Sequence, residues 1–92
     1  MADDESYTIS PSVRTRELDD ELVLLDLNQG LYLSLNESGR AVWRAVESGS
    51  TLASIEAEMV AAWPVSREEA QAMVRGLLRD LIDRGLIVRS GP

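Results

Sequence analysis

Apolar and polar residues alternate in short stretches of the first forty positions, and this pattern predicts strands. The stretch 13–18 alternates weakly, and Asp19-Asp20 follows it as a turn signal. The next stretch, 21–27, has apolar side chains on both sides, with Leu22 and Leu24 on one and Val23, Leu25 and Leu27 on the other. Because a strand that is apolar on both sides is usually covered on both faces, this one is expected to be central.

A hairpin loop, Asn28-Gln29-Gly30, leads to a further strand over 31–35. A type I turn over the first two loop residues would place Gly30 in the left-handed region, where glycine costs least. Along the strand, one side carries Leu31, Leu33 and Leu35, and the other carries Tyr32 and Ser34. Since the chain then leaves the sheet, only one pairing partner is evident, and the second edge of this strand is predicted to be free.

Helical spacing of apolar residues predicts three helices in the rest of the chain. Asn36, Thr51 and Ser66 are predicted N-caps, and Ser66 forms a capping box with Glu69. The predicted helix ends are Gly49, Trp63-Pro64 and Gly85. The short apolar segment 86–88 is expected to be a strand or a packed tail.

Two or three strands followed by three helices indicate an α+β fold. The second and third helices form a helix-turn-helix pair, and the hairpin makes the whole a winged-helix-like module. The chain is divided into a flexible acidic arm (1–11), one domain (12–88) and a loose tail (89–92).

The third helix, 66–84, has a wider apolar arc than one buried face requires. The arc covers roughly 180°, against about 100° for a single face. It places Ala70, Leu77 and Leu81 centrally, Val74 beside them, Leu78 and Ile82 toward one edge, and Met73 and Arg84 toward the other, with Asp80 and Gly76 just beyond. Either a small domain wraps this helix on two sides, or one edge lines a groove. Met73 suits a binding surface, and Gly76 would let another backbone approach closely.

Composition argues against an enzyme. The 92 residues include no cysteine, no histidine and no lysine, since all nine basic residues are arginine. The commonest nucleophile, general base and zinc ligands are therefore missing, and neither catalytic residues nor a metal or cofactor site is predicted.

The charge and hydropathy patterns narrow the possible partners. A formal net charge of -7 repels nucleic acid phosphates and anionic lipid, so neither nucleic acid nor membrane is an expected partner. No apolar run approaches the roughly 18 residues of a membrane span, and residues 1–6 lack the features of a signal peptide. A cytoplasmic protein is expected.

Three spaced patterns of the chain together resemble the PqqD-like family. They are Asp26-Leu27-x-x-Gly30-x-Tyr32-x-x-Leu35-Asn36-x-x-Gly39-x-x-x-Trp43, then Thr51-x-x-x-Ile55, and finally Val74-x-x-Leu77-Leu78-x-x-Leu81-x-x-x-Gly85-Leu86. These proteins are recognition elements for ribosomally made, modified peptides. The resemblance covers about residues 20–88, and a free-standing chain of this length is most similar to the small recognition protein of lasso-peptide pathways. Quinone-pathway members often carry Asp where this chain has Met73, which favours the lasso branch.

The resemblance implies a three-stranded antiparallel sheet followed by three helices in a winged-helix-like domain. It also implies that the chain binds the leader segment of a precursor peptide, which adds as a strand to the third strand and lies against the third helix. The chain would then deliver the precursor to a separate leader peptidase and an ATP-dependent cyclase. The expected peptide-binding residues are Leu31, Tyr32, Leu33, Ser34, Leu35, Met73, Gly76, Leu77, Asp80 and Arg84.

Some alternatives stay open at this point. Alternation alone leaves either Leu33 or Tyr32 as the floor of the groove, and Asp80 and Arg84 are expected to pair with leader charges at its rim. A PqqD-type chaperone for a quinone-cofactor precursor would use the same surface. Two other classes are a winged-helix DNA-binding protein, with Arg75 and Arg79 on the outer face of its helix, and a module that dimerises through the free strand edge.

Overall fold

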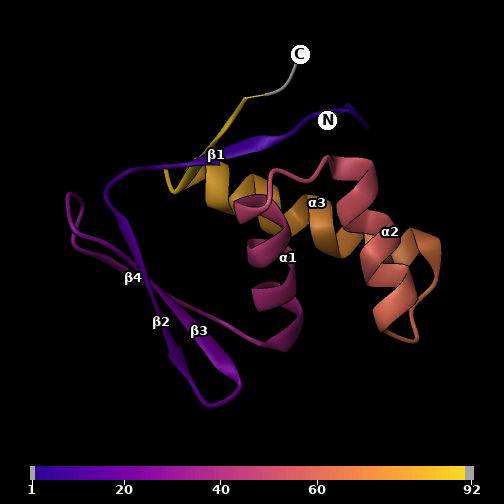
Figure 1. Ribbon diagram of the computed structural model, residues 1–92, viewed down its shortest axis with the longest axis horizontal. Coiled ribbons are helices and arrows are strands. Elements are labelled where there is room, and N and C mark those ends of the chain that lie inside the picture. The colour runs from indigo at the N-terminus through magenta and orange to yellow at the C-terminus, as the bar shows by residue number, and fades with distance from the viewer. Residues whose placement is uncertain (1, 91–92) are drawn as a thin grey trace.

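The computed structural model describes residues 2–90 and arranges them as strands followed by helices, with a last short strand (Figure 1). The elements are β1 (Tyr7–Ile9), β2 (Val13–Leu18), β3 (Glu21–Asp26), β4 (Leu31–Leu35), α1 (Glu37–Glu47), α2 (Leu52–Ala62), α3 (Arg67–Asp83) and β5 (Ile87–Arg89). The α+β class and the three helices are confirmed. The winged-helix-like description stays a prediction.

Strands β2, β3 and β4 form an antiparallel sheet in that order, so β3 is central as predicted. Its register pairs Leu22 with Leu35 and Leu24 with Leu33. These four residues share one face of the sheet and belong to the core or pack against it. The three helices lie on one side of the sheet (Figure 1). On the other side of the sheet, Val23 of β3 is also buried, as expected for a strand that is apolar on both sides.

The hairpin loop between β3 and β4 is tied to the end of α3. Gly30 has a φ of +66°, so the predicted left-handed glycine is confirmed. The Gln29 side-chain amide donates to Asp26 Oδ2 at 2.7 Å and to the carbonyl oxygen of Arg84 at 2.9 Å. Hydrogen bonds from Gln29, and then from Ser12, lower the pKa of the buried Asp26 carboxyl. The loop therefore fixes β4 relative to α3.

All three predicted N-caps are present. The Asn36 side chain accepts from the backbone N–H of Gly39 at 2.9 Å, Thr51 caps α2, and Ser66 and Glu69 form the predicted capping box. Gly39 is closely packed, because a Cβ at this position would lie 3.2 Å from Leu35 Cβ, which is a tight contact. The first turn of α1 therefore lies directly on the end of β4.

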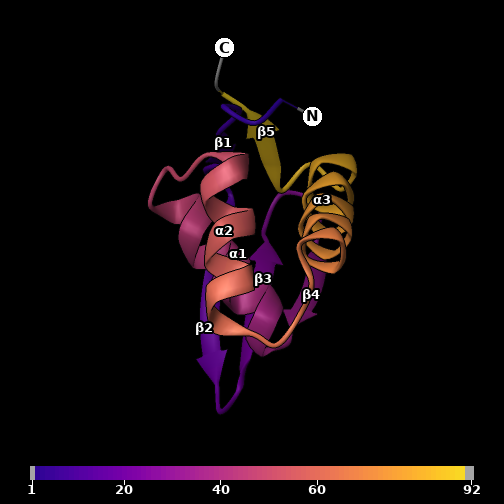
Figure 2. The ribbon, with the colours of Figure 1, turned by 90° about the vertical axis from the view of Figure 1, so that its right-hand side faces the viewer.

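The core lies between the sheet and the helices. In Figure 2, α1 and α2 overlap on one side of the view and α3 stands on the other. The largest fully buried side chain of the core is Trp43 of α1. The same core also contains Leu22, Leu24 and Leu35 from the sheet, Leu52, Ile55 and Met59 from α2, and Ala70, Val74, Leu78 and Leu81 from α3. The buried stripe of α3 therefore runs through Leu78, and Leu77, which the sequence placed centrally, is only partly buried.

The N-terminal segment corrects the expectation of a flexible arm over 1–11. Its residues Tyr7–Ile9 form β1, which pairs antiparallel with β5. The buried Glu5 accepts a hydrogen bond from the Tyr7 hydroxyl at 2.7 Å, and its Oε1 forms an ion pair with Arg89 Nε at 3.2 Å. Burial, and then this hydrogen bond, raise the pKa of the Tyr7 hydroxyl. Three residues of alternation are too few to predict a strand whose partner lies about eighty positions away.

The predicted tail, 89–92, is described only in its first half. Arg89 belongs to β5, and the backbone N–H of Ser90 donates to the carbonyl oxygen of Ser6 at 2.9 Å. Residues 91–92 lie outside the described residues, as does residue 1 of the expected arm. The limits 12–88 of the domain stay a prediction. Within residues 2–90, no helix is long and apolar enough to cross a membrane.

Candidate functional site

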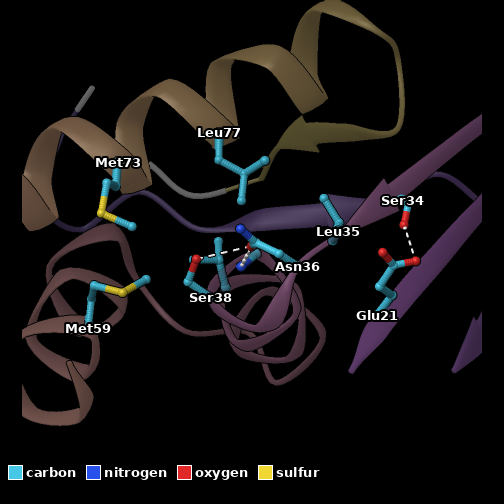
Figure 3. A pocket seen from close by; sticks show the side chains of 10 residues that line it. Glu21, Ser34, Leu35, Asn36, Ser38, Met59, Met73 and Leu77 are labelled. Carbon is cyan, nitrogen blue, oxygen red and sulfur yellow. Dashed lines mark hydrogen bonds between the residues drawn. The ribbon is translucent and has the colours of Figure 1, made fainter. Parts of the chain in front are cut away.

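A cavity of about 490 Å³ opens where the end of β4 meets α1, α2 and α3 (Figure 3). It is lined by Glu21, Ser34, Leu35, Asn36, Ser38, Gly39, Val42, Met59, Met73 and Leu77. Glu21, Ser34 and Leu35 belong to the sheet, and the other residues belong to the three helices or, for Asn36, to the cap of α1. The cavity is of the size of ordinary ligand pockets, which are about 300–1,000 Å³.

One end of the cavity is apolar. Figure 3 shows Met59 of α2 and Met73 of α3 at this end, with Leu77 one turn further along α3. Met59 is buried, whereas Met73 is 42% exposed although it is large and apolar. Methionine side chains are flexible and polarisable, so this end can adapt to apolar groups of different shape.

The other end of the cavity is polar. There the Ser34 hydroxyl donates to Glu21 Oε2 at 3.0 Å, and Figure 3 shows the pair beside Leu35. The side-chain oxygen of Asn36 is already used, since it accepts from Ser38 Oγ at 3.1 Å and from the Gly39 N–H. Glu21 is the single charged residue among the ten that line the cavity.

The structure brings four of the ten sequence-predicted residues to this cavity, namely Ser34, Leu35, Met73 and Leu77. The other six, Leu31, Tyr32, Leu33, Gly76, Asp80 and Arg84, are not part of its lining. Leu33 pairs with Leu24 on the side of the helices and is partly buried. Tyr32 points to the opposite side and is 63% exposed. Of the two alternatives for the groove floor, Leu33 therefore faces the helices.

The predicted residues further along α3 lie on its exposed surface. At Gly76 a Cβ atom would meet nothing within 4 Å, so the surface above this glycine is open. Asp80 and Arg84 are ion-paired with each other, with Asp80 Oδ1 at 3.1 Å from Arg84 Nε. Each of them already has a partner of opposite charge, which reduces what either offers to an incoming charge.

The sequence reading missed six lining residues, Glu21, Asn36, Ser38, Gly39, Val42 and Met59. The sequence identified Asn36 as a helix cap and placed Val42 and Met59 on apolar helix stripes. Neither property distinguishes a residue that lines a cavity from a residue of the core. Glu21 is an ordinary strand residue in the sequence. It becomes part of the cavity because β3 and β4 pair in a register that places it diagonally across from Ser34.

Strand β4 pairs with β3 alone, so its other edge is free among the described residues, as predicted. The outer edge of the sheet at β2 is free as well, but β2 is mostly exposed and carries Arg14, Arg16 and Glu17. Charged side chains on an edge strand discourage pairing with another strand. The β4 edge, whose side chains are mostly leucine, has no such protection.

The winged-helix DNA-binding alternative would use Arg75 and Arg79, and neither of them lines the cavity. Over residues 2–90 no group of three or more carboxylates could hold a metal ion. Arg75, one of the two arginines considered for DNA, has its Nε at 2.7 Å from Glu56 Oε2 and its Nη2 at 3.6 Å from Asp3 Oδ1. Its charge is therefore engaged within the protein.

Comparison with known proteins gives consistent matches. The family model described as coenzyme PQQ synthesis protein D (PqqD) matches residues 21–87. A structure of TbiB1 in complex with the TbiA(β) leader peptide is 33% identical, with a TM-score of 0.81, and the match covers 86% of this chain and 92% of that chain. A structure of lasso peptide synthetase B1 complexed with the leader peptide has the same fold, with a TM-score of 0.84, 22% identity, and coverage of 90% and 98%. No curated protein sequence matches the chain.

Proposed function

The chain belongs to the PqqD family, and from this we propose that it binds the leader segment of a ribosomally synthesised precursor peptide and performs no reaction on it. In the two similar structures, the protein is held in complex with a leader peptide. For the present chain, the observation that carries the proposal is the combination of a free strand edge and an apolar cavity beside it.

The binding mode is strand addition to β4. An extended peptide beside Leu31–Leu35 would use the unpaired N–H and C=O groups of that edge for backbone hydrogen bonds. Since successive side chains of a strand point to opposite faces, every second leader residue would face the helices. There it would meet Leu35, Leu77 and Met73, which form an apolar wall next to the edge.

The helix side of the groove is α3, from Met73 to Arg84. The exposed Gly76 leaves room for a backbone to lie close to the helix, because nothing occupies the position of its missing Cβ. Leu31 and Leu33 continue the apolar wall along the strand, and both are partly buried against the core. Tyr32 would flank the peptide on the opposite face of the sheet. The Asp80–Arg84 pair would lie at the rim, where charges affect specificity more than affinity.

The similarity to a lasso peptide synthetase B1 and to TbiB1 supports a role in a lasso-peptide pathway. In this proposal the chain holds the precursor while a separate leader peptidase and an ATP-dependent cyclase process it. A PqqD-type chaperone for a quinone-cofactor precursor is the second candidate, and it is favoured by the description of the matching family model. Met73, which makes the cavity more apolar, favours the lasso role.

The test is a titration with the labelled synthetic leader of a candidate precursor peptide, in which binding is measured by fluorescence anisotropy. Binding in the micromolar range or tighter is expected, with no chemical change of the peptide by mass spectrometry. A scrambled leader of the same composition is the control. Absence of binding at several hundred micromolar would refute the proposal, and a quinone-pathway leader that binds more tightly would favour the second candidate.

A further inference from the structure

The polar end of the cavity contains a carboxylate that the fold itself does not use for an ion pair. Glu21 accepts one hydrogen bond, from the Ser34 hydroxyl at 3.0 Å. Over residues 2–90, no arginine lies within ion-pair distance of it. By contrast, Glu17, Glu56 and Glu5 all pair with arginine side chains.

The position of this carboxylate distinguishes it from other exposed acids of the chain. Glu21 is the one charged residue among those that line the cavity, and it lies at the end away from Met59 and Met73 (Figure 3). Ser34 is part of β4, whose free edge is the proposed binding edge, and Ser34 points to the face of the sheet away from the helices. In a peptide strand added at this edge, the side chains that point away from the helices would lie on the same face of the sheet as Ser34 and Glu21.

We propose that the Glu21–Ser34 pair is a subsite for a cationic side chain of the leader, a lysine or an arginine. This inference rests on the proposed leader binding and specifies the chemistry of one position in that peptide. A carboxylate with free lone pairs binds an ammonium or guanidinium group by charge-assisted hydrogen bonds, and the Ser34 hydroxyl oxygen can accept one more.

Strand geometry also fixes the spacing of this cation. Leu35 and Ser34 point to opposite faces of the sheet, so leader side chains that meet them also point to opposite faces. Residues of one strand that point to opposite faces are separated by an odd number of positions. The basic residue is therefore expected one or three positions from the apolar residue that fills the cavity.

The experiment is a charge scan of the synthetic leader that binds in the titration above. Each lysine or arginine of that peptide is replaced in turn by glutamine, and the affinities are measured for the wild-type protein and for Glu21→Gln. Glutamine at position 21 keeps an oxygen acceptor for Ser34, so the fold is expected to be unchanged. Glu68→Gln, an exposed glutamate in the first turn of α3 and outside the cavity lining, is the matched control for the loss of one charge.

One basic leader position is expected to weaken wild-type binding roughly two- to five-fold when it becomes glutamine, as for an exposed ion pair. The same replacement has no effect in Glu21→Gln, whereas Glu68→Gln responds like the wild type. Glu21→Lys is expected to bind better when that leader position is changed to glutamate, which a purely structural role of Glu21 would not produce.

Two results would overturn the inference. One is a leader that binds the wild type but has no basic position coupled to Glu21, in which case leader binding stands and the subsite does not. The other is coupling to a basic residue at an even spacing from the apolar anchor. Failure of the wild type to bind any leader refutes the proposed function instead, so the two failures are distinguishable.

Discussion

Replacing Met73 by glutamate is the most direct perturbation of the proposed groove. Met73 lies in the interior of α3, where glutamate is a good helix former, and its side chain is 42% exposed in the free protein. The substitution therefore puts a charge at the cavity without burying it in the core of the unbound fold. The free energy of unfolding is expected to change by less than about 1 kcal/mol.

The effect on binding follows from what the peptide would cover. Complete burial of a methionine side chain contributes about 1.5–3 kcal/mol, so burial of the remaining two fifths contributes about 0.6–1.3 kcal/mol. Met73→Ala is thus expected to weaken leader binding about three- to nine-fold. Glutamate also loses hydration under the peptide, which adds about 1–3 kcal/mol, and Met73→Glu is expected to weaken binding at least about fifteen-fold.

The matched control is Val60→Glu. Val60 lies on α2, is 40% exposed and is not part of the cavity lining, so the same charge is introduced at a similar apolar surface. Affinities are measured by fluorescence anisotropy with a labelled leader, and thermal unfolding by circular dichroism verifies that each variant is folded. A folded Met73→Glu protein that binds the leader as tightly as Val60→Glu does would refute the groove at α3.

Four further outcomes are expected. Hydrogen exchange should show new protection of alternate amides within Leu31–Leu35 on leader binding, and protection at β2 instead would place the peptide on the wrong edge. Gly76→Ala should stabilise the fold by about 0.5–1 kcal/mol in urea unfolding while weakening leader binding, since the added methyl group meets nothing in the free protein. Gly39→Ala should destabilise by about 1–3 kcal/mol, because its Cβ would lie 3.2 Å from Leu35 Cβ, and equal stability would contradict this packing. Hydrogen bonds lower the pKa of the Asp26 carboxyl in the folded state. The stability that they contribute is complete above the unfolded pKa of about 4 and is lost as the pH falls through the folded pKa. In urea unfolding between pH 7 and pH 3, Asp26→Asn should therefore lose less of its free energy of unfolding than the wild type does.

The sequence was most informative where a signal is local. The caps at Asn36, Thr51 and Ser66 need only a few neighbouring residues, and all three are present. Gly30 is likewise a local turn signal, and it has the positive φ expected of it. Strand alternation over 21–35 predicted which side chains share a face of the sheet and which strand edge lacks a partner. Neither prediction depends on the register of the strands.

Long-range packing accounts for what the sequence could not supply. The strand β1 exists because β5 lies beside it, and the pair is joined by Glu5, Tyr7 and Arg89 from opposite ends of the chain. The wide apolar arc of α3 turned out to contain a buried stripe and a cavity edge, but the arc alone did not separate Leu78 from Leu77. That separation depends on where α2 and the sheet contact the helix.

The charges of the chain act at two ranges, and this distinction favours a peptide partner over nucleic acid. At long range, a net charge of -7 attracts cationic peptides and repels phosphates, which affects the rate of association and is screened by salt. At short range, Asp80 and Arg84 of α3 pair with each other, which reduces the charge that either offers to a peptide. Glu21 is then left as the charged group that an incoming strand meets at the cavity. A leader would therefore be attracted by the whole surface, held by backbone pairing and apolar contacts, and selected by one carboxylate.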